Sequence, residues 1–289
     1  MGSVCYAGKS TSFLLRGKIM SEGTMVVTAP VGTGDAGTVG GYGSYNPGGA
    51  TGVPPGQAQA MQAQSIVNGA NFDATCDSIE KYSNENNPDR VIDNFRQSIY
   101  FDQCIATDNS GGIMSWLSSA QVRKTYQISD MGDQLSGSMW SPFSAMANFL
   151  WGNGRPMNVD INKIGLNLQP AGINGFQDQL ASMSAPGTYN FTHQFAYNTG
   201  NDSVAANLYL GNITLKIEGT LNRAADGTWT LNANVRGFQD TYDFNASTHR
   251  TKAAEQLTTA GRFLESLTGG SMPFPINING DLPVTMSGQ

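Results

Sequence analysis

Charged side chains are scarce in this chain of 289 residues, where they account for 13% of the sequence, about half the usual share of a soluble domain. The net charge is −6 and the pI is about 4.8, which argues against a protein that binds nucleic acid through a broad basic surface. No apolar run reaches the roughly 18 residues of a membrane-spanning helix. Glycine is abundant but has no triplet period, which excludes a collagen-like chain.

Cysteine and histidine are also rare. The three cysteines, Cys5, Cys76 and Cys104, are too few for a disulfide framework, and none has the spacing of a zinc site. Cys76 and Cys104 can pair if their segments meet, but two reduced, buried thiols are the favoured interpretation. Of the two histidines, His193 lies in an alternating strand pattern and is expected to be structural, which leaves His249 as the candidate for chemistry.

The N-terminus lacks the pattern of a signal peptide. Its apolar stretch, 13–15, is too short and is followed by Arg16 and Lys18. We therefore expect release from the producing cell without a signal peptide. Met20 is a second possible start, so residues 1–19 are expected to be a dispensable extension.

What the chain does contain changes along its length. Ten glycines and three prolines fall between Val31 and Ala60, a composition typical of a flexible arm. Just before it, residues 23–30 form a β-prone run that is either a strand donated to a partner or a chance pair of valines. From 57 to 134 the pattern is helical, with ten acidic and five basic residues. Helices are predicted over 57–68, from Pro88 through Val91, Phe95 and Ile99, and over 113–122.

Beyond residue 134 short alternating runs predict strands. The clearest pair, 213–217 and 229–235, flanks the turn signal Asp226-Gly227 and predicts a hairpin. Further strands are expected over 159–168, 189–197, 206–221 and 276–278, and helices over 139–151 and from Asn245 to about Leu267. The sequence therefore predicts an α+β chain: an N-terminal arm, a small helical central domain, and a C-terminal antiparallel sheet, open and barrel-like, decorated with helices.

Polar side chains with catalytic chemistry gather near one strand end. Asp240 and Tyr242 alternate and so share a face, and Asp243 follows where the strand turns. His249 and Arg250 come near the first turn of the next predicted helix. Two carboxylates can hold Mg²⁺, an imidazole can move protons, and a guanidinium can bind phosphate oxygens. This set favours attack on a phosphate or pyrophosphate ester, although a polar turn before a capped helix explains the same residues.

Two candidates outside this segment are weaker. Residues 151–155 form an aromatic, flexible, basic loop that either touches a substrate or simply ends a helix. Arg236 precedes the strand end and either supports the site from behind or lies on plain surface.

The pattern D-x-Y-D-x₅-H-R resembles the catalytic signature of colicin M-type bacteriocins at all five specified positions, Asp240, Tyr242, Asp243, His249 and Arg250. The chain is most similar to the smaller M-type pyocins. The resemblance implies a Mg²⁺-dependent phosphodiesterase that hydrolyses the peptidoglycan precursor lipid II between undecaprenyl and pyrophosphate. Asp240 and Asp243 are the expected metal ligands.

The same resemblance implies an organisation and a set of partners. Residues 1–37 would be an import arm whose 23–30 segment is similar to a TonB box, 38–134 a receptor-binding domain, and 135–289 the catalytic domain. The implied partners are lipid II, a TonB-dependent outer-membrane receptor with TonB, and an immunity protein in the producer. The protein is expected to be a monomer that binds no nucleic acid and acts in the periplasm of a target bacterium.

Two other functions fit the composition. Low charge, many asparagines and antiparallel strands suit a surface adhesin or glycan-binding module, which binds without turnover. A generic metal phosphoesterase would instead hydrolyse small phosphate esters.

Overall fold

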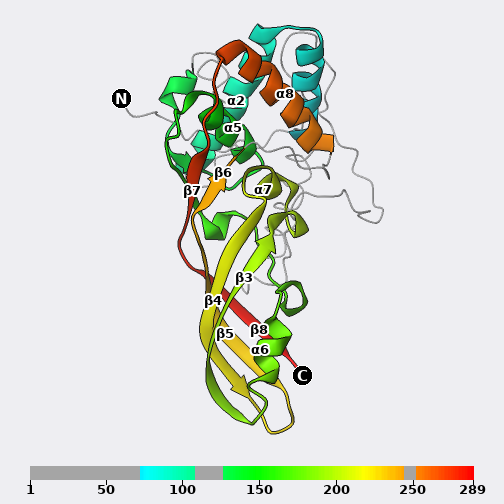
Figure 1. The fold of residues 1–289 in the computed structure, drawn as a ribbon, viewed down its shortest axis with the longest axis vertical. Coiled ribbons are helices and arrows are strands. Elements are labelled where there is room, and N and C mark those ends of the chain that lie inside the picture. The colour runs from blue at the N-terminus through cyan, green and yellow to red at the C-terminus, as the bar shows by residue number, and fades with distance from the viewer. Residues whose placement is uncertain (1–71, 108–125, 244–251) are drawn as a thin grey trace, which may run out of the picture.

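The computed structural model describes residues 72–107, 126–243 and 252–289. Helices gather at one end of an elongated molecule, and a long sheet extends to the other end (Figure 1). The arm over 1–37, and the helices predicted over 57–68 and 113–122, lie outside the described residues.

The helical end contains the helix over 72–84, α2 (Pro88–Thr107), α5 (Ser141–Trp151) and α8 (Lys252–Thr268). The start predicted for α2 is confirmed: Pro88 is its first residue, and the Asn87 side chain accepts a hydrogen bond from the backbone N–H of Arg90 at 3.3 Å. Proline suits this position because the first N–H groups of a helix have no partner within the helix.

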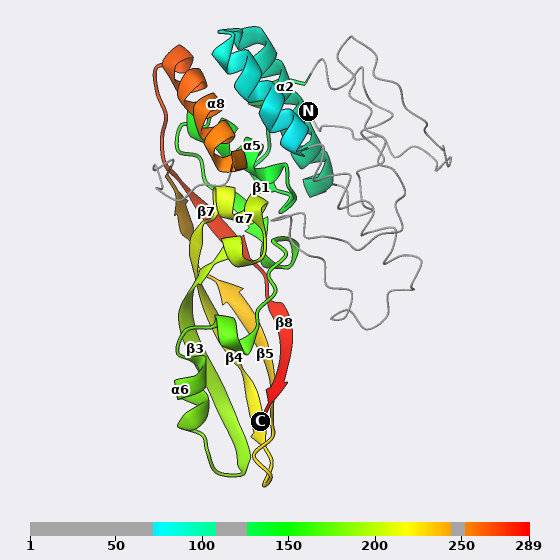
Figure 2. The ribbon, with the colours of Figure 1, turned by 90° about the vertical axis from the view of Figure 1, so that its right-hand side faces the viewer.

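Helix α5 lies at the centre of this end. Its residues 141–150 are all buried, as expected for a helix that is apolar on nearly every side. The Phe143 ring lies edge-on to the rings of Phe72 and Phe95, at 5.5 and 5.6 Å between centroids. Helix α8 lies beside the helix over 72–84 (Figure 2). There the Gln256 amide donates to the Asp77 carboxylate at 2.5 Å.

A four-stranded antiparallel sheet forms the other end, in the order β3 (Gly187–Asn198), β4 (Asn212–Arg223), β5 (Trp229–Gly237) and β8 (Leu282–Gly288). The sheet is open, with β3 and β8 at its edges. The predicted β4–β5 hairpin is confirmed: Asp226 accepts from the N–H of Thr228 at 3.0 Å, and Gly227 adopts φ +90°.

A second sheet joins the helices to the first, in the order β1 (Gln134–Leu135), β2 (Met157–Asp160), β7 (Phe274–Asn279) and β6 (Asp240–Tyr242). The β1–β2 and β2–β7 pairs are parallel and the β6–β7 pair is antiparallel. The α+β class is confirmed, and the parallel pairs are a feature that alternation along the sequence does not reveal.

Two predicted strands are shorter than expected. The run over 159–168 contributes only β2, because Asp160 accepts from the N–H of Asn162 and starts a 3₁₀ turn. The run over 206–221 begins inside α7 (Val204–Tyr209), whose first turn is capped by the Ser203 hydroxyl. The short helix α6 (Phe176–Ala181) lies beside the antiparallel sheet.

Buried side chains form one cluster that runs from the helix over 72–84 and α2 into both sheets. Cys76 and Cys104 lie in this cluster as buried thiols, the favoured interpretation. Among the described helices, none has the length and apolar character needed to cross a membrane. The domain boundary at 134–135 stays a prediction.

Candidate functional site

The strand that carries Asp240, β6, continues the chain from a strand of the other sheet. β5 pairs with β8, and after two linking residues the same chain becomes β6 and pairs with β7 (Figure 1). Val235 pairs with Leu282 and Asp240 with Ile276, so residues 236–239 oppose the longer segment 277–281. No strand pairing joins these two described segments, and the register differs by one residue between the two ladders. We refer to this unpaired step between the sheets as the bulge, because it has the same effect of shifting register by one residue.

This bulge decides which side chains point inward. In β5 the odd-numbered Leu231 and Val235 are buried, whereas in β6 the even-numbered Tyr242 is buried and Asp240 is partly buried. Phe238 and Gln239, which are consecutive, are both exposed. The predicted shared face of Asp240 and Tyr242 is therefore present, and it is the inward face of β6.

Tyr242 fills the space between β6, β7 and α5. Its side chain is 5% exposed; its ring stacks on Phe274 at 5.1 Å and lies edge-on to Phe149 at 5.7 Å. Burial raises the pKa of the phenol, so the hydroxyl stays protonated at neutral pH. Of the two roles open to this tyrosine, packing beneath the site is the one seen in the described contacts.

Asp240 and Asp243 form a pair of neighbouring carboxylates. Burial raises the pKa of Asp240, the backbone N–H of Thr241 lowers it, and the negative charge of Asp243 raises it further. Asp243 itself is exposed. Two carboxylates that repel each other at a half-open position suit Mg²⁺, which accepts one or two protein carboxylates and keeps several waters. Within the described residues no cluster of three or more potential metal ligands occurs, so a metal held here by described side chains would have Asp240 and Asp243 as its protein ligands.

His249 and Arg250 lie outside the described residues. The described part of α8 begins at Lys252, two positions after Arg250. Three of the five predicted site residues are therefore placed by the structure, and it brings together Asp240, Tyr242 and Asp243 at one strand end.

The other histidine has the structural role that the sequence predicts. His193 lies in β3; its Nε2 is 2.7 Å from the backbone oxygen of Asn174, and its ring stacks on Phe195 at 5.8 Å.

The loop over 151–155 ends α5, which is the simpler of the two interpretations of this segment. The N–H of Gly152 donates to the backbone oxygen of Asn148 at 2.7 Å. Asn153 and Gly154 adopt φ values of +51° and +74°. The Arg155 guanidinium donates to the Met131 oxygen at 3.0 Å. The loop also borders a pocket of about 330 Å³, lined by Ile128, Ser129, Met131, Ala147, Trp151, Gly152 and Arg155.

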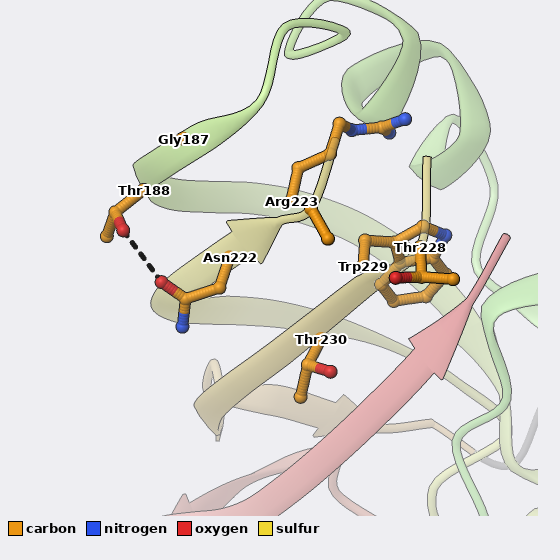
Figure 3. A pocket seen from close by; sticks show the side chains of 8 residues that line it. Gly187, Thr188, Asn222, Arg223, Thr228, Trp229 and Thr230 are labelled. Carbon is orange, nitrogen blue, oxygen red and sulfur yellow. Dashed lines mark hydrogen bonds between the residues drawn. The ribbon is translucent and has the colours of Figure 1, made fainter. Parts of the chain in front are cut away.

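A second pocket, of about 370 Å³, lies at the far end of the antiparallel sheet, and sequence patterns gave no sign of it. Thr188 donates to Asn222 at 2.8 Å on its rim (Figure 3). The Arg223 guanidinium donates to the backbone oxygen of Leu180 at 3.2 Å. Its described lining is Gly187, Thr188, Asn222, Arg223, Ala224, Thr228, Trp229 and Thr230. Neither described lining contains Asp240, Tyr242 or Asp243.

Comparison with known proteins gives a consistent picture. The Colicin M family profile matches residues 112–289. Colicin-M of Escherichia coli is 41% identical over 156 residues, which are 54% of this chain and 55% of that protein; the match thus spans about half the length of this relative.

Solved structures extend the likeness. Truncated bacteriocin syringacin M from Pseudomonas syringae is 30% identical, with a TM-score of 0.60 over 78% of this chain and 96% of that one. PaeM, a colicin M-like bacteriocin of Pseudomonas aeruginosa, is 24% identical, with a TM-score of 0.59 over 83% of this chain and 90% of that one, and supports the fold alone.

Proposed function

The chain belongs to the colicin M family, and from this premise we propose that it is a bacteriocin that hydrolyses lipid II. The bond cleaved joins the undecaprenyl chain to the pyrophosphate. Water is consumed, and the products are undecaprenol and the pyrophosphorylated disaccharide-peptide. Loss of lipid II blocks cell-wall synthesis in the target cell.

The observation that carries this proposal is the arrangement at the end of β6. Asp240 is held half-buried on the inward face, Asp243 adds a second carboxylate three residues later, and Tyr242 anchors the strand against α5. All five positions of the D-x-Y-D-x₅-H-R pattern are present in the sequence. Aspartates, an imidazole and a guanidinium are the groups that hydrolysis of a phosphate ester uses.

Each residue has a proposed role. Asp240 is the main carboxylate, as metal ligand or nucleophile, and Asp243 assists with the metal or orients a water. His249 moves the proton and Arg250 holds the pyrophosphate, since a guanidinium matches phosphate oxygens with two parallel donors. Mg²⁺, held by Asp240 and Asp243, would neutralise charge on the pyrophosphate.

The family also suggests where the protein acts. We propose import through a TonB-dependent receptor and TonB by the arm over 1–37, action in the periplasm at the outer face of the inner membrane, and an immunity protein in the producer. The domains proposed for receptor binding and catalysis are 38–134 and 135–289, and the active form is proposed to be a monomer.

The decisive experiment is lipid II hydrolysis by the full chain, followed by thin-layer detection of undecaprenol, with Mg²⁺ and with EDTA. Asp240→Ala is expected to lower turnover by at least about 10³-fold, because it removes a group that acts at the reacting atoms. Asp178→Ala, a change at an exposed carboxylate on α6, is the matched control and should leave turnover unchanged.

Other outcomes point to other functions. Full activity in a folded Asp240→Ala variant would refute its central role. Glycan binding without undecaprenol release, independent of metal, favours an adhesin; hydrolysis of small phosphate esters without action on lipid II favours a generic phosphoesterase.

A further inference from the structure

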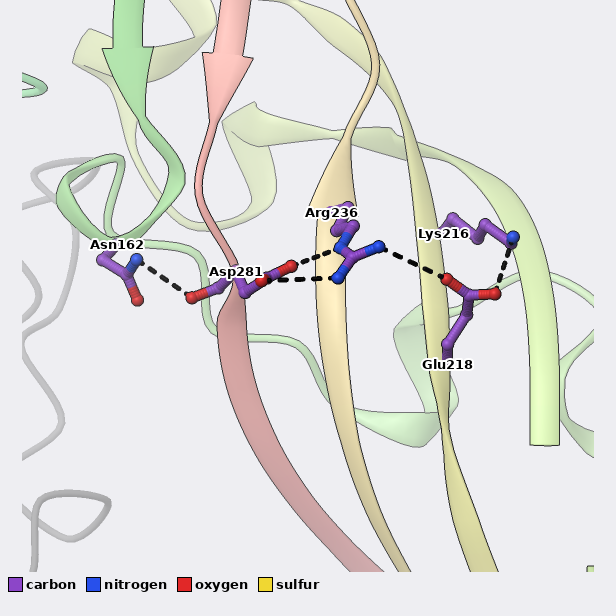
Figure 4. A network of polar contacts seen from close by, with 5 residues as sticks. All are labelled: Asn162, Lys216, Glu218, Arg236 and Asp281. Carbon is purple, nitrogen blue, oxygen red and sulfur yellow. Dashed lines mark hydrogen bonds and ion pairs between the residues drawn. The ribbon is translucent and has the colours of Figure 1, made fainter. Parts of the chain in front are cut away.

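A row of charged side chains crosses the outer face at the point where β5 becomes β6. Both oxygens of the Asp281 carboxylate accept from Arg236: Nε donates to Oδ1, and Nη2 donates to Oδ2 at 3.4 Å. Glu218 of β4 lies 4.0 Å from the Arg236 guanidinium and 2.7 Å from the Lys216 ammonium (Figure 4). The Arg236–Asp281 pair therefore bridges the two strands beside the bulge.

Asp281 is fixed from its other side as well. It follows Gly280, which adopts φ +89°, and its backbone oxygen accepts from the Asn162 amide at 3.0 Å. The same amide donates to Asp160 at 2.9 Å, at the end of β2. Arg236 is thus tied, through Asp281, to the strand next to β7.

The side chains of Arg236 and Asp240 point to different faces. In β5 the Arg236 side chain alternates with the buried Val235 and points outward, whereas Asp240 points inward after the bulge. We therefore expect an effect of Arg236 on Asp240 to pass through the four-residue step along the backbone.

The Arg236–Asp281 ion pair is also expected to contribute little to the stability of the fold. The side chains of Arg236 and Asp281 are 60% and 46% exposed, and ion pairs this open contribute little to the free energy of unfolding. Two-pronged geometry fixes direction and register more than energy.

We propose that Arg236 and Asp281 are positioning residues that lock the unpaired step between the two sheets and thereby hold Asp240 on the inward face of β6. The expected effect on turnover rests on the proposed lipid II hydrolysis. The expected effect on the position of β6 does not depend on it. Displacement of a reacting group by about 1 Å can lower a rate about 100-fold, so a surface pair that sets the register can control turnover from outside the site.

The test uses Asp281→Asn and Arg236→Gln in the full chain. Backbone hydrogen exchange at residues 238–242 should rise at least about tenfold, while the melting temperature stays within about 2 °C because the pair is exposed. For lipid II hydrolysis, kcat should fall about tenfold or more, with KM within about twofold. The reversed pair, Arg236→Asp with Asp281→Arg, should recover most of both losses.

Asp93→Asn is the matched control, because it removes the exposed carboxylate of the Arg96–Asp93 pair on α2 by the same chemical change. Hydrogen exchange at 238–242 and kcat should be unchanged in this variant. Unchanged hydrogen exchange at 238–242 in both Asp281→Asn and Arg236→Gln would overturn the proposal, whatever the effect on kcat. If the wild type fails to hydrolyse lipid II, the proposed function falls, and the exchange measurement still decides whether the pair holds β6.

Discussion

Asp102 shows how much one buried carboxyl can organise. It lies on α2, is fully buried, and its Oδ1 accepts from the hydroxyls of Ser136 and Ser141, the latter at 2.8 Å, and from the N–H of Ser136 at 3.2 Å. Burial raises its pKa, and the surrounding hydroxyl groups and N–H oppose that rise. One side chain thereby ties α2 to the segment that leads into α5.

The pH dependence of stability follows from this raised pKa. A carboxyl that binds its proton more tightly when folded contributes fully below its unfolded-state pKa, about 3.9, and the contribution is lost as pH rises through the folded-state pKa. Asp102→Asn stays neutral and keeps the Oδ1 acceptor. Urea unfolding at several pH values should therefore show wild type losing stability relative to Asp102→Asn as pH rises above about 4.

Asp102→Ala should behave differently, with a loss of about 3 kcal/mol at neutral pH, because it leaves buried hydroxyls without their acceptor. A pH-independent difference between wild type and Asp102→Asn would contradict a raised pKa. Asp178→Asn, an exposed change, controls for net charge.

Some functional and structural residues could be identified from the sequence, and others could not. Asp240, Tyr242 and Asp243 could be named because their chemistry and spacing are local. The partners of Asp102 could not, since Ser136 and Ser141 come 34 and 39 residues later in the chain and only the packed fold brings them together.

Among the elements, the bulged crossing of β5–β6 over β7–β8 is the one on which the candidate site depends. Gly280 makes it possible, because a φ of +89° is strained for residues that carry a Cβ. A Cβ at Gly280 would also lie 3.2 Å from the Asp160 carboxylate.

Gly280→Ala is expected to lower the free energy of unfolding by about 1–2 kcal/mol, from backbone strain and this close contact. Gly172→Ala is the control: Gly172 has an ordinary φ and open space around its Cβ position, so stability should change by less than about 0.5 kcal/mol. Denaturant unfolding of both variants measures the difference, and equal midpoints would show that the bulge does not need glycine.

Elements that depend on neighbouring residues were predictable from the sequence, whereas the bulge, which depends on pairing between distant strands, was not. α2, α5 and the β4–β5 hairpin follow from a helix start signal, an apolar run and an Asp-Gly turn. The β2–β7 pairing joins residues more than 100 positions apart, and α7 depends on one serine cap inside an apolar stretch that also fits a strand.

At the scale of the whole molecule, the candidate site lies where the helical end meets the long sheet. β6 contacts α5 through Tyr242 and Phe149, and it continues directly from β5. The family match over 112–289 includes both sheets, α5 and α8. The apparatus proposed for catalysis is therefore separate in sequence from the arm proposed for import.

A variant that lacks residues 1–37 is expected to hydrolyse purified lipid II as fast as the full chain and to lose killing of intact target cells. Killing should return when the variant is placed in the periplasm by osmotic shock, since import would then be bypassed. Loss of hydrolysis in vitro, in a variant with an unchanged melting temperature, would contradict the assignment of the arm to import.

The two chain segments that link the sheets also affect how the molecule responds to force. A pulling force applied from the N-terminal side, as import by the arm would require, first loads the helix over 72–84 and α2, which contribute no strand to either sheet. β5 runs on into β6 and β7 runs on into β8, so a load on one sheet is passed to the other through both links. We expect the strand that carries Asp240 to be among the last parts to give way under load, and to regain its form only when both sheets have closed again.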